Sequence, residues 1–191
     1  MGIIHKIPNC TAVILCGGKS SRMGFDKSLL RIDGEFVLLK RVKQLKGVFP
    51  EVLLVTDKRS KFPASFSQVE IKEDRYSEKG PLGGLVTALE TVKTEYLFLL
   101  ACDIPNVNIA LIQKMAESIA AYDVVICSQN DRLEPLFGFY RHSCLAVLQQ
   151  QLQTNDWRIR KEFNRFLVKV VESSLALNNV NLPKELPLWC Q

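Results

Sequence analysis

Short runs of apolar residues alternate along the chain with longer segments in which apolar residues recur every three or four positions. A short apolar run between polar residues is typical of a strand buried on both faces, and the three-to-four spacing is typical of an amphipathic helix. Strands are therefore predicted at residues 12–16, 29–32, 51–56, 69–72, 95–101, 122–127 and 166–171, with a further strand ending near residue 140. Helices are predicted at residues 36–46, 82–92, 108–120 and 142–152. This alternation predicts an α/β fold of three layers, with a mostly parallel sheet between two layers of helices.

The predicted helix at residues 36–46 carries several basic side chains between its apolar positions. They are Lys40, Arg41, Lys43 and Lys46. Charged side chains on the polar face of an amphipathic helix normally lie in water. We therefore expect these residues to be exposed.

Length and composition indicate one globular domain that covers residues 1–191. Apolar residues make up 47% of the chain, a share typical of a folded protein rather than a disordered one. The net charge of +5 suits an anionic ligand, but the basic residues are spread along the chain, which argues against a nucleic-acid-binding stripe. No apolar run is long enough to cross a membrane, and the N-terminus lacks the apolar core of a signal peptide.

The six cysteines include no Cys-x-x-Cys pair, so zinc and thioredoxin-like sites have little support. Several cysteines lie inside apolar runs, where a free cysteine behaves as a small apolar side chain. This usage predicts a reduced, cytoplasmic protein.

A short polar loop follows the first apolar run and begins with Gly17-Gly18. Glycine lets the backbone approach a ligand closely because it has no Cβ atom, and successive N–H groups in such a loop form a hollow that binds anions. Lys19, Arg22 and Lys27 add positive charge over the same stretch. The pattern indicates a polyphosphate site. A Gly-Gly pair alone also marks tight turns, and the spacing is neither that of a P-loop nor that of the dinucleotide-binding loop.

Asp103 comes shortly after the apolar run 95–101. A carboxylate at the end of a buried strand needs a partner, and beside a phosphate site that partner is usually magnesium, which prefers oxygen ligands. The competing interpretation is an N-cap for a helix that begins near Asn106 or Asn108. Spacing alone leaves both interpretations open.

The glycine loop also resembles the signature of the MobA-like nucleotidyltransferases, Leu-x-Gly-Gly-x-Ser-x-Arg-Met-Gly-x-Asp-Lys. The matching residues are Leu15, Gly17, Gly18, Ser20, Arg22, Met23, Gly24, Asp26 and Lys27. Cys16 stands where the family usually has alanine. The family's Leu-x-x-Asp-x-Pro segment is matched by Leu100, Asp103 and Pro105.

The resemblance implies a Rossmann-like nucleotide-binding fold and the transfer of GMP from Mg-GTP to the phosphate of molybdopterin, with release of pyrophosphate. Its implied partners are GTP, Mg²⁺ and the molybdopterin cofactor. It admits molybdoenzymes or other cofactor-synthesis proteins as protein partners, and it implies neither nucleic acid nor membrane. Arg22 and Lys27 would hold the triphosphate, while Asp103 would bind Mg²⁺ on the other side of one cleft.

The resemblance also implies how the base is bound. Backbone groups are expected to line the base at Leu15, Cys16 and Gly17. The family has an acidic residue before a Gly-Pro-Leu-x-Gly segment, which corresponds here to residues 80–84. Asp74 is the favoured match for that residue, with Glu78 as its rival. We expect the segment to be a second glycine-rich loop that leads into the helix at residues 82–92.

Two further segments concern the acceptor. Asn179 and Asn181 resemble the family's Asn-x-Asn, but Leu182 stands where a threonine usually follows. These asparagines are expected either to contact the acceptor or to cap a last helix. The basic segment 157–161 is expected either to approach a pterin phosphate or to pack with Trp157 in the core.

Two other functions are compatible with the same residues. Related transferases use CTP or UTP, or another acceptor, and backbone contacts to a base leave no trace in the side chains. The second is a nucleotide-binding regulatory module without turnover. Arg22, Lys27 and Asp103 favour catalysis over that module, because a pure binder has less need of groups that stabilise developing charge.

Overall fold

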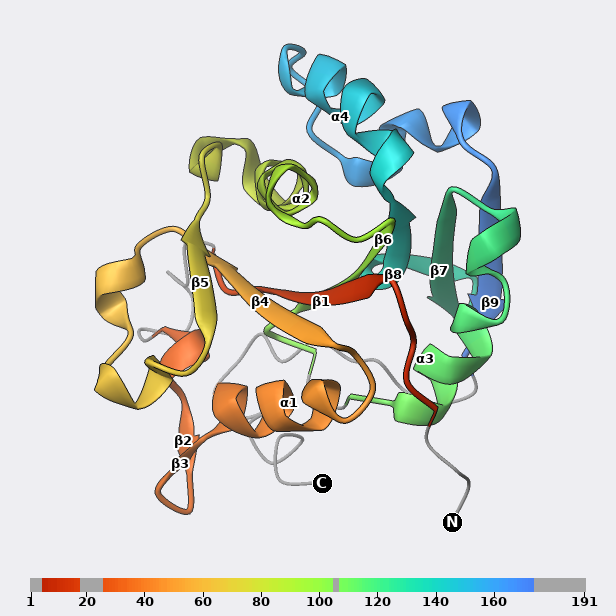
Figure 1. The fold of residues 1–191 in the computed structure, drawn as a ribbon. Helices are drawn as coiled ribbons and strands as arrows, with labels where there is room; N and C mark the ends of the chain where they lie inside the picture. Colours follow the sequence, from red (N-terminus) through yellow and green to blue (C-terminus); the bar gives the residue numbers. More distant parts are fainter. Residues whose placement is uncertain (1–4, 18–25, 105–106, 174–191) are drawn as a thin grey trace.

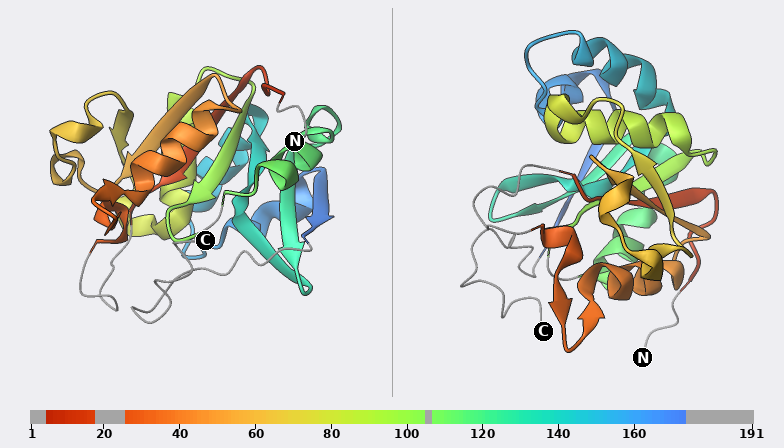
Figure 2. Two further views of the ribbon diagram at one scale, coloured as in Figure 1. Left: turned by 90° about the horizontal axis from the view of Figure 1, so that it is seen from below. Right: turned by 90° about the vertical axis from the view of Figure 1, so that its left-hand side faces the viewer.

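A seven-stranded sheet forms the centre of the protein in the computed structural model, which describes residues 5–17, 26–104 and 107–173 (Figure 1). The strand order is β5-β4-β1-β6-β8-β7-β9. The strands are β1 (Cys10–Leu15), β4 (Glu51–Thr56), β5 (Glu70–Glu73), β6 (Tyr96–Ala101), β7 (Val124–Gln129), β8 (Arg132–Arg141) and β9 (Val168–Glu172). A separate hairpin of β2 (Arg31–Ile32) and β3 (Glu35–Phe36) projects from the body of the molecule (Figures 1 and 2).

The sheet is mostly parallel, as predicted, and β8 is the strand that runs against its neighbours β6 and β7. The reversal has a local cause. Asn130 and Asp131 join β7 to β8, and both have positive φ angles, of 48° and 61°. Positive φ at both central residues is the geometry of the tight turn that suits a β-hairpin, so the chain folds back and β8 lies antiparallel to β7.

Among the described residues, four α-helices cover the two faces of the sheet. They are α1 (Val37–Lys46), α2 (Gly80–Thr91), α3 (Ile109–Ala116) and α4 (Leu145–Leu152). Figure 1 shows α2 and α4 on one face and α1 and α3 on the other, which confirms the predicted three layers. Within the described residues, no helix has both the length and the apolar character that crossing a bilayer requires.

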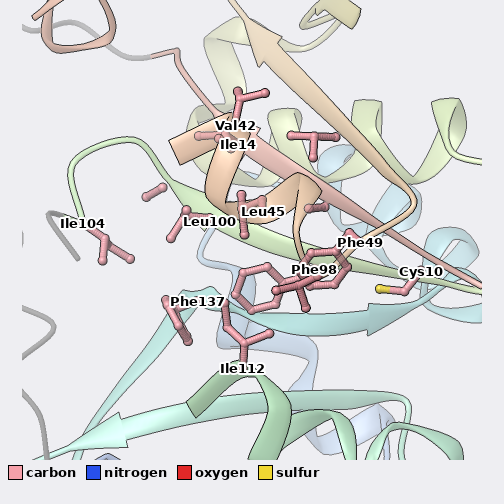
Figure 3. Close-up of a cluster of buried hydrophobic side chains, with 14 of the residues drawn as sticks. Cys10, Ile14, Val42, Leu45, Phe49, Phe98, Leu100, Ile104, Ile112 and Phe137 are labelled. Atoms are coloured by element: carbon pink, nitrogen blue, oxygen red, sulfur yellow. The ribbon is translucent and has the colours of Figure 1, made fainter. Parts of the chain in front are cut away.

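The alternation of side chains along β1 divides the core into two clusters. Ala12 and Ile14 pack on the side of α1 and α3, whereas Val13 and Leu15 pack on the side of α2 and α4. Successive side chains of a strand point to opposite faces, so a strand that is buried on both sides is apolar throughout. In the first cluster the rings of Phe49 and Phe98 stack at 5.4 Å between centroids (Figure 3).

The strand order predicts the edge of the sheet at which a ligand binds. β4 lies on one side of β1, and β6 lies on the other. In an open parallel sheet, the crevice at the carboxyl ends of two such strands is the usual ligand site. The residues that follow β1 and β6 therefore line the edge where a ligand is expected.

The glycine-rich segment 80–84 is part of a helix rather than a loop, because α2 already begins at Gly80. Its glycines serve packing. A Cβ atom at Gly83 would lie 2.2 Å from the carbonyl oxygen of Tyr76, which is a backbone atom. At Gly84 the nearest atom would be the Cδ2 of Leu15, at 3.0 Å. Gly83 thus lets α2 approach the preceding turn closely.

We predict that Gly83→Ala lowers the free energy of unfolding by about 1–3 kcal/mol, the usual cost of forcing extra volume into a packed site. Gly84→Ala is the matched control. It gains the same helix propensity, but its tightest contact is the movable end of a leucine side chain, and the Asp74 carboxylate lies at an ordinary 3.6 Å. Urea unfolding of the two variants should therefore show Gly83→Ala as clearly the less stable. Equal stability would contradict the packing role of Gly83.

Candidate active site

Lys27 and Asp103 face each other at the ligand edge of the sheet. Asp103 follows β6, and Lys27 is the first residue of the short 3₁₀ helix η1 (Lys27–Leu29). The Lys27 Nζ lies 3.8 Å from the Asp103 Oδ2, and the two side chains are 13% and 26% exposed. This distance is longer than a hydrogen bond, so the pair is held by charge attraction between two largely buried side chains. The structure thus brings together two of the residues that the sequence singled out.

The Asp103 carboxylate is poorly compensated. Its Oδ1 atom is buried and has no hydrogen-bond partner among the described residues. Burial raises the pKa of Asp103, while Lys27, its own backbone N–H and Arg41 act in the opposite direction. A buried carboxylate oxygen without a donor is a costly arrangement that a bound cation relieves.

The capping interpretation of Asp103 is not the one that the structure adopts. Asn108 is the N-cap of α3, and its Oδ1 accepts a hydrogen bond from the backbone N–H of Leu111 at 3.0 Å. Asp103 therefore does not cap α3, and its side chain is 26% exposed beside Lys27.

A second acidic residue, Glu134 of β8, faces the same region. It is half-buried, and burial raises its pKa, an effect to which the nearby charge of Asp103 contributes. The described residues contain no group of three or more His, Cys, Asp or Glu side chains placed to hold a metal. Mg²⁺ needs fewer, because it commonly binds one or two carboxylates together with substrate phosphates and water. The carboxylate of Asp103 fits that requirement.

Lys61 contacts both Cys16 and Asp26, an arrangement that the sequence analysis did not predict. Its Nζ donates to the carbonyl oxygen of Cys16 at 2.8 Å and to Oδ1 of Asp57 at 2.8 Å. The same atom lies 2.8 Å from Oδ2 of Asp26. Although burial opposes the shift, the hydrogen bonds to the two carboxylates raise the pKa of Lys61. The available signal was the spacing of Asp57 and Lys61, four residues apart.

The expectation that Arg41 is exposed was wrong. Its side chain is buried, with 2% exposure, whereas Lys40, Lys43 and Lys46 are exposed as predicted. Arg41 points to the carboxyl end of β6, where its Nη1 donates to the carbonyl oxygen of Cys102 at 2.5 Å. A guanidinium is tolerated there because it meets a backbone acceptor and nearby negative charge.

The backbone at the end of β1 is largely engaged within the protein. The carbonyl oxygen of Leu15 accepts from the N–H of Cys102 at 3.0 Å, and the N–H of Cys16 donates to the carbonyl oxygen of Val55 at 2.7 Å. Because the Cys16 carbonyl accepts from Lys61, Gly17 is the residue of this trio best placed to offer backbone groups to a base. The predicted base contacts of Leu15, Cys16 and Gly17 stay a prediction.

Asp74 lies at the carboxyl end of β5 and organises the turn before α2. Its Oδ1 accepts from the backbone N–H of Tyr76 at 2.8 Å and from the Thr87 hydroxyl at 2.9 Å. Burial raises its pKa. Its rival Glu78 is exposed. Asp74 is thus more buried and better ordered by hydrogen bonds than Glu78. Those bonds connect it to Tyr76 and to α2, not to the Lys27–Asp103 pair.

Several predicted site residues lie outside the described part of the chain. They are Arg22, Asn179 and Asn181. In the basic segment 157–161, Trp157 is partly buried against the cluster around α2 and α4, and Arg158 pairs with Asp156 at 2.5 Å. Packing is therefore the role that the structure gives Trp157.

Known proteins resemble this chain along most of its length. Residues 12–169 match the model of the MobA-like NTP transferase domain. A probable molybdenum cofactor guanylyltransferase of Carboxydothermus hydrogenoformans is 32% identical over 186 residues, which cover 93% of this chain and 93% of that protein. The molybdenum cofactor guanylyltransferase of Syntrophotalea carbinolica is 34% identical over 146 residues, which cover 74% of this chain and 68% of that protein.

A solved structure supports the fold independently. The molybdopterin-guanine dinucleotide biosynthesis protein A from Archaeoglobus fulgidus superposes with a TM-score of 0.77. It is 19% identical in sequence, and the superposition covers 93% of this chain and 95% of that one. The strand arrangement is therefore shared with a protein whose sequence has diverged widely.

We predict that Asp103→Asn does not destabilise the ligand-free protein at neutral pH. A carboxyl whose pKa is higher in the folded state costs stability once the unfolded chain ionises, which occurs as the pH rises above about 4. Asparagine removes that cost. Thermal unfolding at pH 7 should give a melting temperature equal to or above that of the wild type, and this advantage should shrink at pH 4.

Glu117→Gln is the control, since Glu117 is exposed. It should leave the melting temperature nearly unchanged at both pH values. A lower melting temperature for Asp103→Asn at pH 7 would contradict the inference that the buried carboxylate is poorly compensated without a ligand.

Proposed function

The chain belongs to the MobA-like NTP transferase family, and we propose that it transfers GMP from Mg-GTP to the phosphate of molybdopterin, releasing pyrophosphate. The curated relatives at 30% identity or more support this choice of substrate by their names. The observation that carries it is the Lys27–Asp103 pair, a cation and a carboxylate 3.8 Å apart at the carboxyl ends of β1 and β6.

The transfer places specific demands on these residues. An oxygen of the acceptor phosphate attacks the α-phosphorus of GTP, the bond from that phosphorus to the bridging oxygen breaks, and pyrophosphate leaves with the electron pair. Negative charge grows on the phosphoryl oxygens and on the leaving group. A fixed cation in a partly dry site stabilises that charge, and Lys27 supplies it.

Mg²⁺ is the cofactor of this proposal. Asp103 would hold it, because its buried Oδ1 lacks a donor among the described residues and magnesium prefers carboxylate oxygen. When bound, the ion neutralises the charge of the triphosphate and orients it for displacement. Burial raises the pKa of Asp103, and the charges of Lys27 and Arg41 act against that shift and so favour the ionised carboxylate that a cation binds.

Other residues complete the proposed site. Arg22 assists Lys27 at the triphosphate, Asp74 contributes to the choice of base, and Asn179 and Asn181 contact the acceptor. We place the reaction in the cytoplasm, because the cysteines of the described residues are free thiols, as is usual in a reducing compartment.

Pyrophosphate release tests the reaction. Purified protein, Mg²⁺ and molybdopterin are incubated with GTP, CTP, UTP or ATP, and we expect release with GTP. Release with CTP or UTP instead would identify a transferase with another base preference. Tight GTP binding without release would favour the regulatory module.

We predict that Lys27→Met lowers kcat by roughly a hundredfold to a thousandfold, the usual loss when one preorganised electrostatic group is removed. Methionine is unbranched and only one atom shorter than lysine, but it carries no charge. Lys40→Met makes the same change at an exposed position of α1 and should leave kcat unchanged. Near-normal turnover of Lys27→Met would remove Lys27 from the catalytic machinery.

A further inference from the structure

Lys61 contacts the residue that follows β1 and the residue that precedes Lys27, although it is distant from both in the chain. It belongs to the 3₁₀ helix η2 (Arg59–Lys61), which follows β4. Its ammonium has three N–H donors, and three acceptors lie at 2.8 Å: the Cys16 carbonyl, Asp26 and Asp57. The Lys61 side chain is only 15% exposed, so solvent screens these interactions weakly.

The Asp26 carboxylate connects Lys61 to the short helix that begins with Lys27. One oxygen of Asp26 contacts Lys61, whereas the other caps η1 by accepting from the backbone N–H of Ser28 at 2.9 Å and from its hydroxyl at 2.6 Å. Lys27 is the next residue after Asp26. Cys16, the other anchor, directly precedes residues 17–25 in the chain.

We propose that Lys61 is a positioning residue of the active site, which ties Cys16 to Asp26 and so fixes the place from which Lys27 faces Asp103. Its donors are directed to the protein itself, so a direct contact with the triphosphate would require one of three short bonds to break. The kinetic part of the test rests on the proposed function, and the structural part does not.

The structural test measures amide hydrogen exchange. In Lys61→Met the amides of Ser28 and Leu29, which are bonded to Asp26, should exchange faster than in the wild type. Lys58→Met is the matched control, because Lys58 is exposed, lies in the same connection and carries the same charge. Unchanged exchange at Ser28 and Leu29 in Lys61→Met would overturn the proposal, whatever reaction the protein catalyses.

The kinetic test uses the double mutant with Lys27→Met. Lys61→Met alone should lower kcat between about tenfold and a hundredfold with little change in the KM for GTP, the usual cost of a small misplacement. Lys61→Arg should recover part of the loss. In the Lys27→Met background, Lys61→Met should cost almost nothing more, because it acts through Lys27. A raised KM with unchanged kcat, or losses that multiply, would overturn the positioning role.

A separate observation concerns Arg41. It is buried on α1, and its Nη1 bonds the carbonyl of Cys102, the residue before Asp103. Hydrogen bonds that involve a charged donor are roughly twice as strong as neutral ones. We infer that Arg41 is a positioning residue for Asp103, which holds the end of β6 so that the carboxylate is aimed into the crevice.

Calorimetric GTP titrations with and without Mg²⁺ test the role of Arg41. Arg41→Met should bind GTP alone as the wild type does, but should lose about tenfold of the affinity that Mg²⁺ adds, the scale of one charge-assisted hydrogen bond. Arg41→Lys keeps a charged donor and should lose less of the affinity that Mg²⁺ adds. If Arg41→Met does not fold, Arg41→Lys alone still tests the role, by comparison with the wild type. The exposed Lys43→Met is the control. Equal losses with and without Mg²⁺, or no loss in either variant, would overturn the inference.

Discussion

The parallel pairing of β1 with β6 determines where the functional groups of this protein can meet. Leu15 is the register partner of Ala101, so the chain leaves both strands at the same level of the sheet. The N–H of Cys102 then donates to the Leu15 carbonyl and extends the pairing beyond the strands. Because the apolar core lies on both faces of these strands, their polar continuations must lie at the edge. Asp103, two residues after the end of β6, therefore lies at that edge.

Three cationic side chains at this edge each contact a specific acceptor or carboxylate. Lys61 and Arg41 each bind a backbone carbonyl just beyond a strand end, at Cys16 and at Cys102. Lys27 faces Asp103 at a distance that leaves the two charges short of a hydrogen bond. Rigid, preorganised charge of this kind stabilises a developing anion without reorganisation during the reaction, which is what phosphoryl transfer requires.

The sequence predicted the three layers and most of the strands, because these depend on local patterns of apolar residues, and it singled out Lys27 and Asp103, which the structure places 3.8 Å apart. It could not predict Arg41 or Lys61 in the same way. Each binds a backbone carbonyl, 61 and 45 residues away, and a carbonyl has no identity in the sequence; only the spacing of Asp57 and Lys61 gave a local signal. By helical periodicity, Arg41 looks like any other basic residue beside an apolar stripe.

Local turn and packing chemistry explains the remaining differences. The positive φ angles of Asn130 and Asp131 reverse the chain, so β8 lies antiparallel to β7 within the sheet that alternation predicted as mostly parallel. Residues 80–84 looked like a second ligand loop because they are rich in glycine. The close approach of Gly83 to the Tyr76 carbonyl shows that helix packing needs at least one of those glycines.

A crystal structure of the protein with Mg²⁺ and GTP that carries a methylene group between its α and β phosphorus atoms tests the central claim most directly. That analogue cannot undergo the transfer. We predict that its triphosphate contacts the Lys27 ammonium, and that Mg²⁺ is coordinated by the triphosphate and by the Asp103 carboxylate. A nucleotide bound elsewhere on the sheet, or a metal held without Asp103, would contradict the assignment of this crevice as the active site.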